Sequence, residues 1–122
     1  HPRRDNMLVS LSGPVTNILL AAFFVILFKL FPGIFDNSTP VGMLMGIFLM
    51  LNMILAAFNL IPIYPLDGSH IVEGILPENL AEGWQKTYPF GFIILLILMI
   101  SGGLFIIMRP ILNFISIIIG LH

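Results

Sequence analysis

One stretch interrupts the apolar sequence and decides the fold: residues 59–68, Asn59-Leu-Ile-Pro-Ile-Tyr-Pro-Leu-Asp67-Gly68. Its two prolines, Pro62 and Pro65, each remove a backbone N–H donor and clash with the preceding helical turn. The helix that arrives from residue 41 should therefore unwind here and leave a proline-broken, extended segment over 59–68. Irregular backbone at membrane depth persists only inside protein or beside a water-filled cavity. An ionisable side chain costs about 2.5–3.5 kcal/mol at the bilayer centre, so Asp67 is a functional-site candidate.

The composition places the chain among integral membrane proteins. Of its 122 residues, 58% are hydrophobic and only 9% are charged, whereas about a quarter of a soluble domain is charged. The long runs are apolar on every side instead of alternating, which favours helices and an all-α fold. The net charge of −1 argues against a nucleic-acid partner, and the lack of cysteine excludes thiolate metal ligands and cysteine nucleophiles.

Three apolar runs, 7–31, 41–63 and 90–108, are long enough to cross about 30 Å of hydrocarbon. We expect a single polytopic membrane domain over 1–122, with these three transmembrane helices and a shorter apolar segment at 111–121. The short segment is a half-span, a re-entrant piece or part of a fourth span.

The polar connection over 64–89 should contain short helices at 69–76 and 77–87. Its glutamates are expected to form a solvated face: Glu73, Glu78 and Glu82. Arg3 and Arg4 flank the first span, while the loop 32–40 has no Lys or Arg. By the positive-inside rule, the N-terminus and the 64–89 connection should be cytoplasmic.

The first span holds a second polar element, Ser12-Gly13-Pro14-Val15-Thr16-Asn17. Small residues let a neighbouring helix approach closely, and an amide inside the membrane needs a hydrogen-bond partner. The element therefore predicts a packing seam with one interhelical hydrogen bond. Gly42 and Gly46 in the second span have the Gly-x-x-x-Gly spacing that also favours close packing.

Asp67 suits a metal site because carboxylate oxygens bind zinc, and catalytic zinc takes three protein ligands plus a water. Zinc lowers the pKa of that water toward about 7, which provides a nucleophile at neutral pH. The unwound segment would also offer free backbone donors and acceptors to an extended substrate strand. The simpler alternative is an Asp-Gly turn at a helix exit, with the carboxylate among headgroups and water.

The pattern Asn59-x-x-Pro62-x-x-Pro65-Leu66-Asp67-Gly68 resembles the second signature of the site-2 proteases, zinc metalloproteases that cut within membranes. The continuation Ser69-His70-Ile71-Val72 to Leu76-Pro77 resembles the compact bacterial and archaeal branch, which lacks a PDZ domain. The upstream elements Pro2-Arg3-Arg4-Asp5 and Ser12-Gly13-Pro14-x-x-Asn17 fit the same branch, so the similarity covers most of residues 2–77. It implies a protein of the prokaryotic cell membrane that hydrolyses peptide bonds of transmembrane protein substrates.

The resemblance also implies roles for individual residues. Asp67 would be the third zinc ligand, and Asn59 would hold the substrate carbonyl or the oxyanion. Pro62 and Pro65 would keep the substrate entry open before the Gly68 that completes the signature. Asn17 would support the site from the neighbouring helix.

One departure from the family is large. Its first signature, His-Glu-x-x-His, supplies two ligands and the general base, and the chain does not contain it. We therefore expect this chain to be the C-terminal part of the enzyme, inactive until N-terminal helices with that motif are supplied. His70 follows Asp67 by three residues, so the two could chelate a metal from one helical turn, but two ligands make a poor catalytic site and we expect a surface or headgroup role for His70.

Two other function classes compete with the protease. A broken helix with Asn and Asp is also typical of ion-coupled transporters, which would show sodium- or proton-coupled flux and no zinc. A catalytically dead homologue that binds unfolded membrane segments would lack His-Glu-x-x-His upstream.

Overall fold

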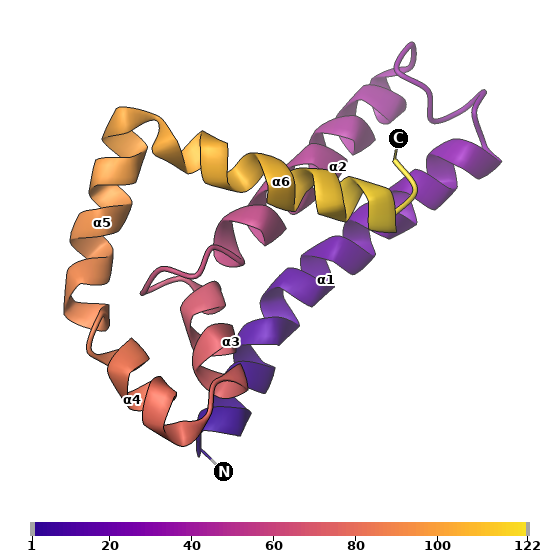
Figure 1. Ribbon diagram of the computed structural model, residues 1–122. Coiled ribbons are helices and arrows are strands. Elements are labelled where there is room, and N and C mark those ends of the chain that lie inside the picture. Colours follow the sequence, from indigo (N-terminus) through magenta and orange to yellow (C-terminus); the bar gives the residue numbers. More distant parts are fainter. Residues whose placement is uncertain (1, 122) are drawn as a thin grey trace.

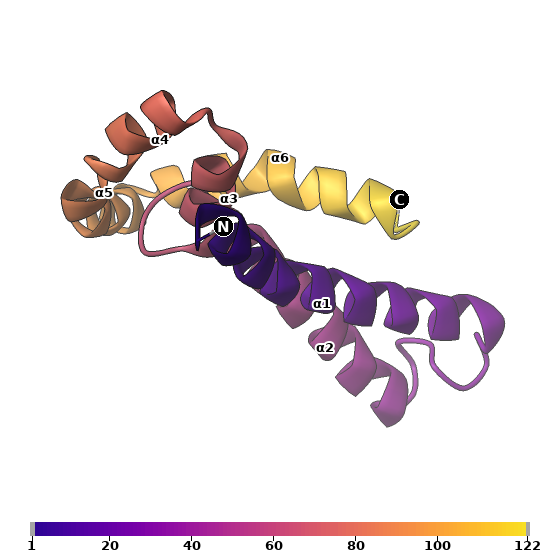
Figure 2. The ribbon, with the colours of Figure 1, turned by 90° about the horizontal axis from the view of Figure 1, so that it is seen from below.

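The computed structural model describes residues 2–121, and it is helical throughout, with turns but no strand in that range. The six helices are α1 (Pro2–Leu30), α2 (Pro40–Asn59), α3 (Asp67–Ile75), α4 (Glu78–Gln85), α5 (Tyr88–Ser101) and α6 (Gly103–Ile118). Helices α1 and α2 form an antiparallel hairpin, and α3 lies beside the N-terminal half of α1 (Figure 1). Helices α4 and α5 leave the hairpin as an arm, and α6 returns across α2 (Figure 1). Figure 2 shows the hairpin in one layer, with α4 and α6 on the same side of it.

The helices have the length and composition of membrane spans. Helices α1 and α2 are each long and apolar enough to cross a bilayer. Helices α4 and α5 are bent by 58° at their break and count as a third span when taken together. The protein is therefore an all-α integral membrane protein with two spans, or three if the bent pair is one, as the composition predicts.

Small side chains let α1 and α2 approach each other. Ala21 of α1 and Ala56 and Ala57 of α2 are completely buried. In lipid, helices gain little from burying apolar surface, because the surrounding tails are apolar too, so close van der Waals packing must hold them together. The core around these alanines also takes in side chains from the break, from α6 and from the residue that follows α6: Ile61, Leu104, Met108, Ile115 and Ile119.

The third expected span differs from the prediction. The sequence predicted one helix over 90–108, but α5 ends at Ser101, and Gly102 adopts a left-handed φ of 81°. Glycine reaches this conformation without a Cβ penalty and commonly ends helices this way. Pro110, just beyond the expected span, lies inside α6, because membrane helices tolerate an interior proline. The apolar segment 111–121 is thus mostly the second half of α6 and not a separate piece.

The glycine pair of α2 also acts differently from the prediction. A Cβ on Gly42 would collide with the backbone carbonyl of Asp36, so this glycine packs against the 31–39 loop and not against a helix. The same end of α2 is capped by Thr39, whose hydroxyl accepts from the Gly42 N–H at 3.0 Å, and Pro40 occupies the first turn. The tight loop therefore fixes how α2 leaves α1.

Candidate active site

The helix break lies where the two prolines predict it. Helix α2 ends at Asn59, and residues 60–66 form bends and turns, with a cis peptide bond between Tyr64 and Pro65. Only short-range backbone bonds occur here, such as Leu66 N–H to the Ile63 carbonyl at 2.8 Å. The segment is more compact than the extended strand expected over 59–68, since Asp67 and Gly68 already belong to the first turn of α3. Several backbone groups between Asn59 and Asp67 are thus outside any helix.

Asp67 lies half-buried at the N-terminus of α3, where the helix dipole favours a negative charge. Its Oδ2 would be 3.5 Å from a Cβ built on Gly13 of α1, so the carboxylate faces a position without a side chain. Within residues 2–121, the carboxylate has no hydrogen bond or ion pair. Gly68 sits so close to the carbonyls of Leu60 and Ile61 that a Cβ would collide with both. Small residues on both sides therefore bring α3 tightly onto the break and leave the carboxylate room.

The two candidate asparagines lie on the helices that border the break. Asn59 is the last residue of α2 and is half-buried. Asn17 is half-buried on α1, one turn after Gly13 and therefore on the same side of the helix. Neither side-chain amide makes a hydrogen bond within the described part of the chain. By contrast, the Asn52 amide donates to the Phe48 carbonyl at 2.8 Å and is satisfied inside its own helix.

Arg3 ties α1 to the far end of α3. Its guanidinium donates to the Glu73 carbonyl at 2.8 Å and to the Leu76 carbonyl at 2.6 Å. A cation at a helix C-terminus satisfies orphan carbonyls and opposes the negative end of the dipole. Met7 of α1 packs so closely on Gly74 that a Cβ there would meet it at 2.5 Å. The sequence suggested only a topological role for Arg3, but the structure uses it to anchor α3.

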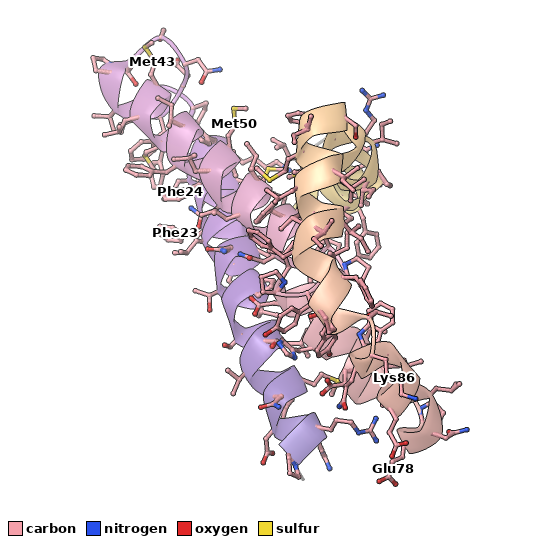
Figure 3. The ribbon with its side chains drawn as sticks, turned by 90° about the vertical axis from the view of Figure 1, so that its left-hand side faces the viewer. Phe23, Phe24, Met43, Met50, Glu78 and Lys86 are labelled. Atoms are coloured by element: carbon pink, nitrogen blue, oxygen red, sulfur yellow. The ribbon has the colours of Figure 1, made fainter. Side chains whose placement is uncertain are left out.

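The expectation of a solvated face was wrong for Glu73. This glutamate is 4% exposed, and its Oε1 accepts a hydrogen bond from the Tyr88 hydroxyl at 2.6 Å. Trp84 adds a bond from its indole N–H to the Ser69 carbonyl at 2.8 Å. Ser69 and Glu73 are one turn apart and therefore share a face of α3, and this spacing is the sequence feature that could have indicated burial of Glu73. Only the fold shows that α4 and α5 cover this face. Glu78 at the start of α4 and Lys86 just after its end are exposed and project outward (Figure 3), and Glu82 is exposed as well.

His70, which is also on α3, lies against the aromatic rings of Tyr64 from the break and Tyr88 from α5. The rings of Tyr64 and Tyr88 stack with centroids 4.6 Å apart, and each meets the imidazole edge-on at 5.9 and 5.7 Å. The Nδ1 atom of His70 is buried and has no hydrogen-bond partner among the described residues. The half-buried imidazole is therefore less exposed than we expect for a residue at the surface or among headgroups.

The side chains around Asp67 supply only part of what a metal site needs. A half-buried, unpaired carboxylate facing a glycine suits a metal ligand, because zinc accepts a carboxylate oxygen. However, no group of three or more His, Cys, Asp or Glu side chains that could hold a metal comes together within residues 2–121. In the part of the chain that the structure describes, Asp67 is therefore not joined by two further candidate ligands.

Comparison with known proteins agrees with these features. The chain is 33% identical over 117 residues to the protein named "Putative zinc metalloprotease YwhC" of Bacillus subtilis, covering 92% of this chain and 53% of that protein. It is 29% identical over 86 residues to "Zinc metalloprotease MJ0392" of Methanocaldococcus jannaschii, covering 70% of this chain and 24% of that protein. The chain thus spans about half or less of the length of these relatives. No solved structure matches it significantly.

A family model described as peptidase family M50 matches residues 36–101, which include the second half of the hairpin, the break, α3, α4 and α5. This is more than half of the chain and contains the Asn59 to Gly68 signature that resembles the site-2 proteases. The chain belongs to peptidase family M50, the family of the site-2 proteases.

Proposed function

We propose that this chain is the C-terminal part of a zinc-dependent intramembrane endopeptidase and that Asp67 is its third zinc ligand. The observation that carries the proposal is the half-buried, unpaired carboxylate at the start of α3, facing Gly13 beside the broken helix. A charge that is partly removed from water without a partner carries a desolvation cost, so a bound cation gives this arrangement a physical reason. Membership of a metalloprotease family supports zinc as that cation.

The bound zinc would supply Lewis-acid chemistry, polarising the substrate carbonyl and the attacking water. Asp67 would hold the metal from the side of α3, with its charge supported by the helix dipole. Gly13 would keep α1 from filling the space in front of that carboxylate. His70 is three residues further along α3 and stays a weaker candidate ligand, because its Nδ1 is buried among tyrosine rings.

The broken segment would position the substrate. Backbone groups over 60–66 lie outside helices, so they can pair with an extended peptide. Pro62 and Pro65 prevent this segment from closing into a helix. The unpaired Asn59 amide would donate to the substrate carbonyl or to the oxyanion, as positioned amides do in other hydrolases. Asn17 would support the same region from α1.

The remaining partners follow from the same proposal. Two histidine ligands and the general-base glutamate would come from N-terminal helices with His-Glu-x-x-His, and this chain alone would be inactive. The substrate would be a transmembrane protein in the lipid bilayer of a prokaryotic cell, and the N-terminus of α1 would be cytoplasmic. Arg3 and Arg4 at that end support the orientation.

Substitution of Asp67 in the full-length protein tests the proposal. We expect Asp67→Asn to keep the fold but to remove most bound zinc, measured by metal analysis, and cleavage of a transmembrane substrate. Glu78→Gln is the matched control, because this carboxylate is exposed on α4. Full zinc content and cleavage in Asp67→Asn would refute the assignment. Ion-coupled flux without zinc would favour a transporter, and an upstream sequence without His-Glu-x-x-His would favour a binding homologue.

A further inference from the structure

A second feature lies at the opposite end of the hairpin from Asp67. An apolar hollow of about 720 Å³ opens where α1, the 31–39 loop, α2 and the end of the chain after α6 meet. Val25 and Leu49 form its buried part, while Ile47 and Leu121 line the more exposed part. Met43 and Met50, which also line it, lie along α2 in Figure 3. Ligand pockets of proteins span roughly 300–1,000 Å³, so this loop-end hollow is large enough for a lipid chain.

The residues that line the loop-end hollow include one of each charge, Lys29 and Asp36, both exposed. The Lys29 ammonium donates one hydrogen bond to the Gly120 carbonyl at 2.9 Å, and its other two N–H groups are left over. Asp36 Oδ1 accepts from the Ser38 N–H at 2.8 Å and from the Ser38 hydroxyl, and these bonds lower the pKa of Asp36. The carboxylate is therefore held ionised in the loop.

These two charges do not neutralise each other. Lys29 and Asp36 both line the hollow, yet they form no ion pair in the part of the chain that the structure describes. The Asn37 side chain also lines the hollow and adds an amide acceptor beside Asp36. A cation and an anion that share one apolar hollow without pairing are complementary to a zwitterion with an apolar tail.

We propose that the loop-end hollow binds a phosphatidylethanolamine molecule, with its phosphate on Lys29, its ammonium on Asp36 and an acyl chain along the apolar lining. Lys29 is a snorkelling lysine at the end of a membrane helix, where lipid phosphates lie. The ethanolamine ammonium has N–H groups that a carboxylate and an amide oxygen can accept. The quaternary nitrogen of choline has none, so phosphatidylcholine would lose these bonds.

This lipid site is independent of the proposed protease chemistry. Lys29 is sixteen residues from Gly13 on α1, which corresponds to about 24 Å along the helix. Lipid binding and metal binding can therefore be lost separately by substitution.

The test uses the full-length protein in bicelles that contain phosphatidylethanolamine, phosphatidylcholine or phosphatidylglycerol, with retained lipid counted by native mass spectrometry. We expect phosphatidylethanolamine to be retained about tenfold more strongly than phosphatidylcholine, as expected for one charge-assisted hydrogen bond. Asp36→Asn should remove this preference, because asparagine keeps the acceptor for Ser38 but not the charge. Lys29→Gln should weaken retention of all three phospholipids, and Lys86→Gln, at the exposed residue just after α4, is its control.

A second pair of variants tests the apolar part. Ile47→Trp should fill the loop-end hollow and reduce retention of every lipid, while Leu51→Trp, on the same helix but outside the hollow, should not. Equal retention of phosphatidylethanolamine and phosphatidylcholine in the wild type would overturn the proposal. So would a preference for phosphatidylglycerol that Asp36→Asn strengthens. Photo-reactive phosphatidylethanolamine that labels the spans evenly, without enrichment around the hollow, would overturn the proposal as well.

Discussion

The hydrogen bond between Tyr88 and Glu73 predicts a large effect of removing a single oxygen atom. The hydroxyl donates to a carboxylate that is 4% exposed, at an O–O distance of 2.6 Å. In Tyr88→Phe this oxygen of Glu73 loses its donor. Hydrogen bonds to charged groups contribute about 1.5–3 kcal/mol, so we expect the free energy of unfolding to fall by that amount.

The measurement is reversible unfolding of the full-length protein in mixed detergent micelles, with Tyr64→Phe as the matched control. Tyr64 stacks on Tyr88, but its own hydroxyl makes no hydrogen bond within residues 2–121. Its loss should change stability by less than about 0.5 kcal/mol, as for ordinary surface changes.

A double-mutant cycle with Glu73→Gln separates the bond from other effects of each change. Contacting residues that share one hydrogen bond show coupling energies of about 0.5–3 kcal/mol. A coupling near zero, or equal stabilities of Tyr88→Phe and Tyr64→Phe, would refute the view that this bond holds α3 against α5. Zinc content of the same variants would show whether displacement of α3 also disturbs Asp67.

Three further changes follow from the same contacts. Gly68→Ala should destabilise the protein by about 1–3 kcal/mol in detergent unfolding, because the added methyl group would collide with two carbonyls of the break; Gly83→Ala, which meets nothing within 4 Å, should be neutral or stabilising. Arg3→Gln should speed amide hydrogen exchange at the C-terminal turn of α3. Arg4→Gln, which changes the exposed neighbouring residue, should leave this exchange unchanged, and equal exchange rates in the two variants would contradict the anchoring role of Arg3. The pKa of Asp36 is lowered by its serine partner, so the contribution of this bond to stability is present above the ordinary carboxyl pKa and is lost as the pH falls through the lower folded value. An NMR titration of Asp36 should show a lowered midpoint, and Ser38→Ala should return this midpoint toward the ordinary carboxyl value.

The clamp on α3 matters because the metal-ligand candidate sits on a short helix. A helix of nine residues is not stable alone, so its direction depends on its neighbours. Arg3 holds its C-terminal carbonyls, and Tyr88 and Trp84 hold its covered face. The position of Asp67 is therefore set by residues that lie far from it in the sequence.

Local chemistry made several features predictable from the sequence. The low charge content and long apolar runs indicated membrane helices, since only helices satisfy every backbone group within one segment. Pro62 and Pro65 placed the end of α2, because proline lacks the donor that a continuing helix needs. The same signature led to the family and made Asp67 the leading site candidate.

Other features depended on tertiary structure. Glu73 looks like a solvated residue in a polar loop, and it is buried only because α4 and α5 fold back over α3 and bring Tyr88 to it. The pair Gly102-Gly103 permits a left-handed helix end in the third apolar run, but glycine alone does not require one, and only the structure shows that α5 ends there and that α6 returns across α2. Helix starts and stops follow from nearby residues, whereas burial and partner choice follow from contacts between helices that the linear order of residues does not reveal.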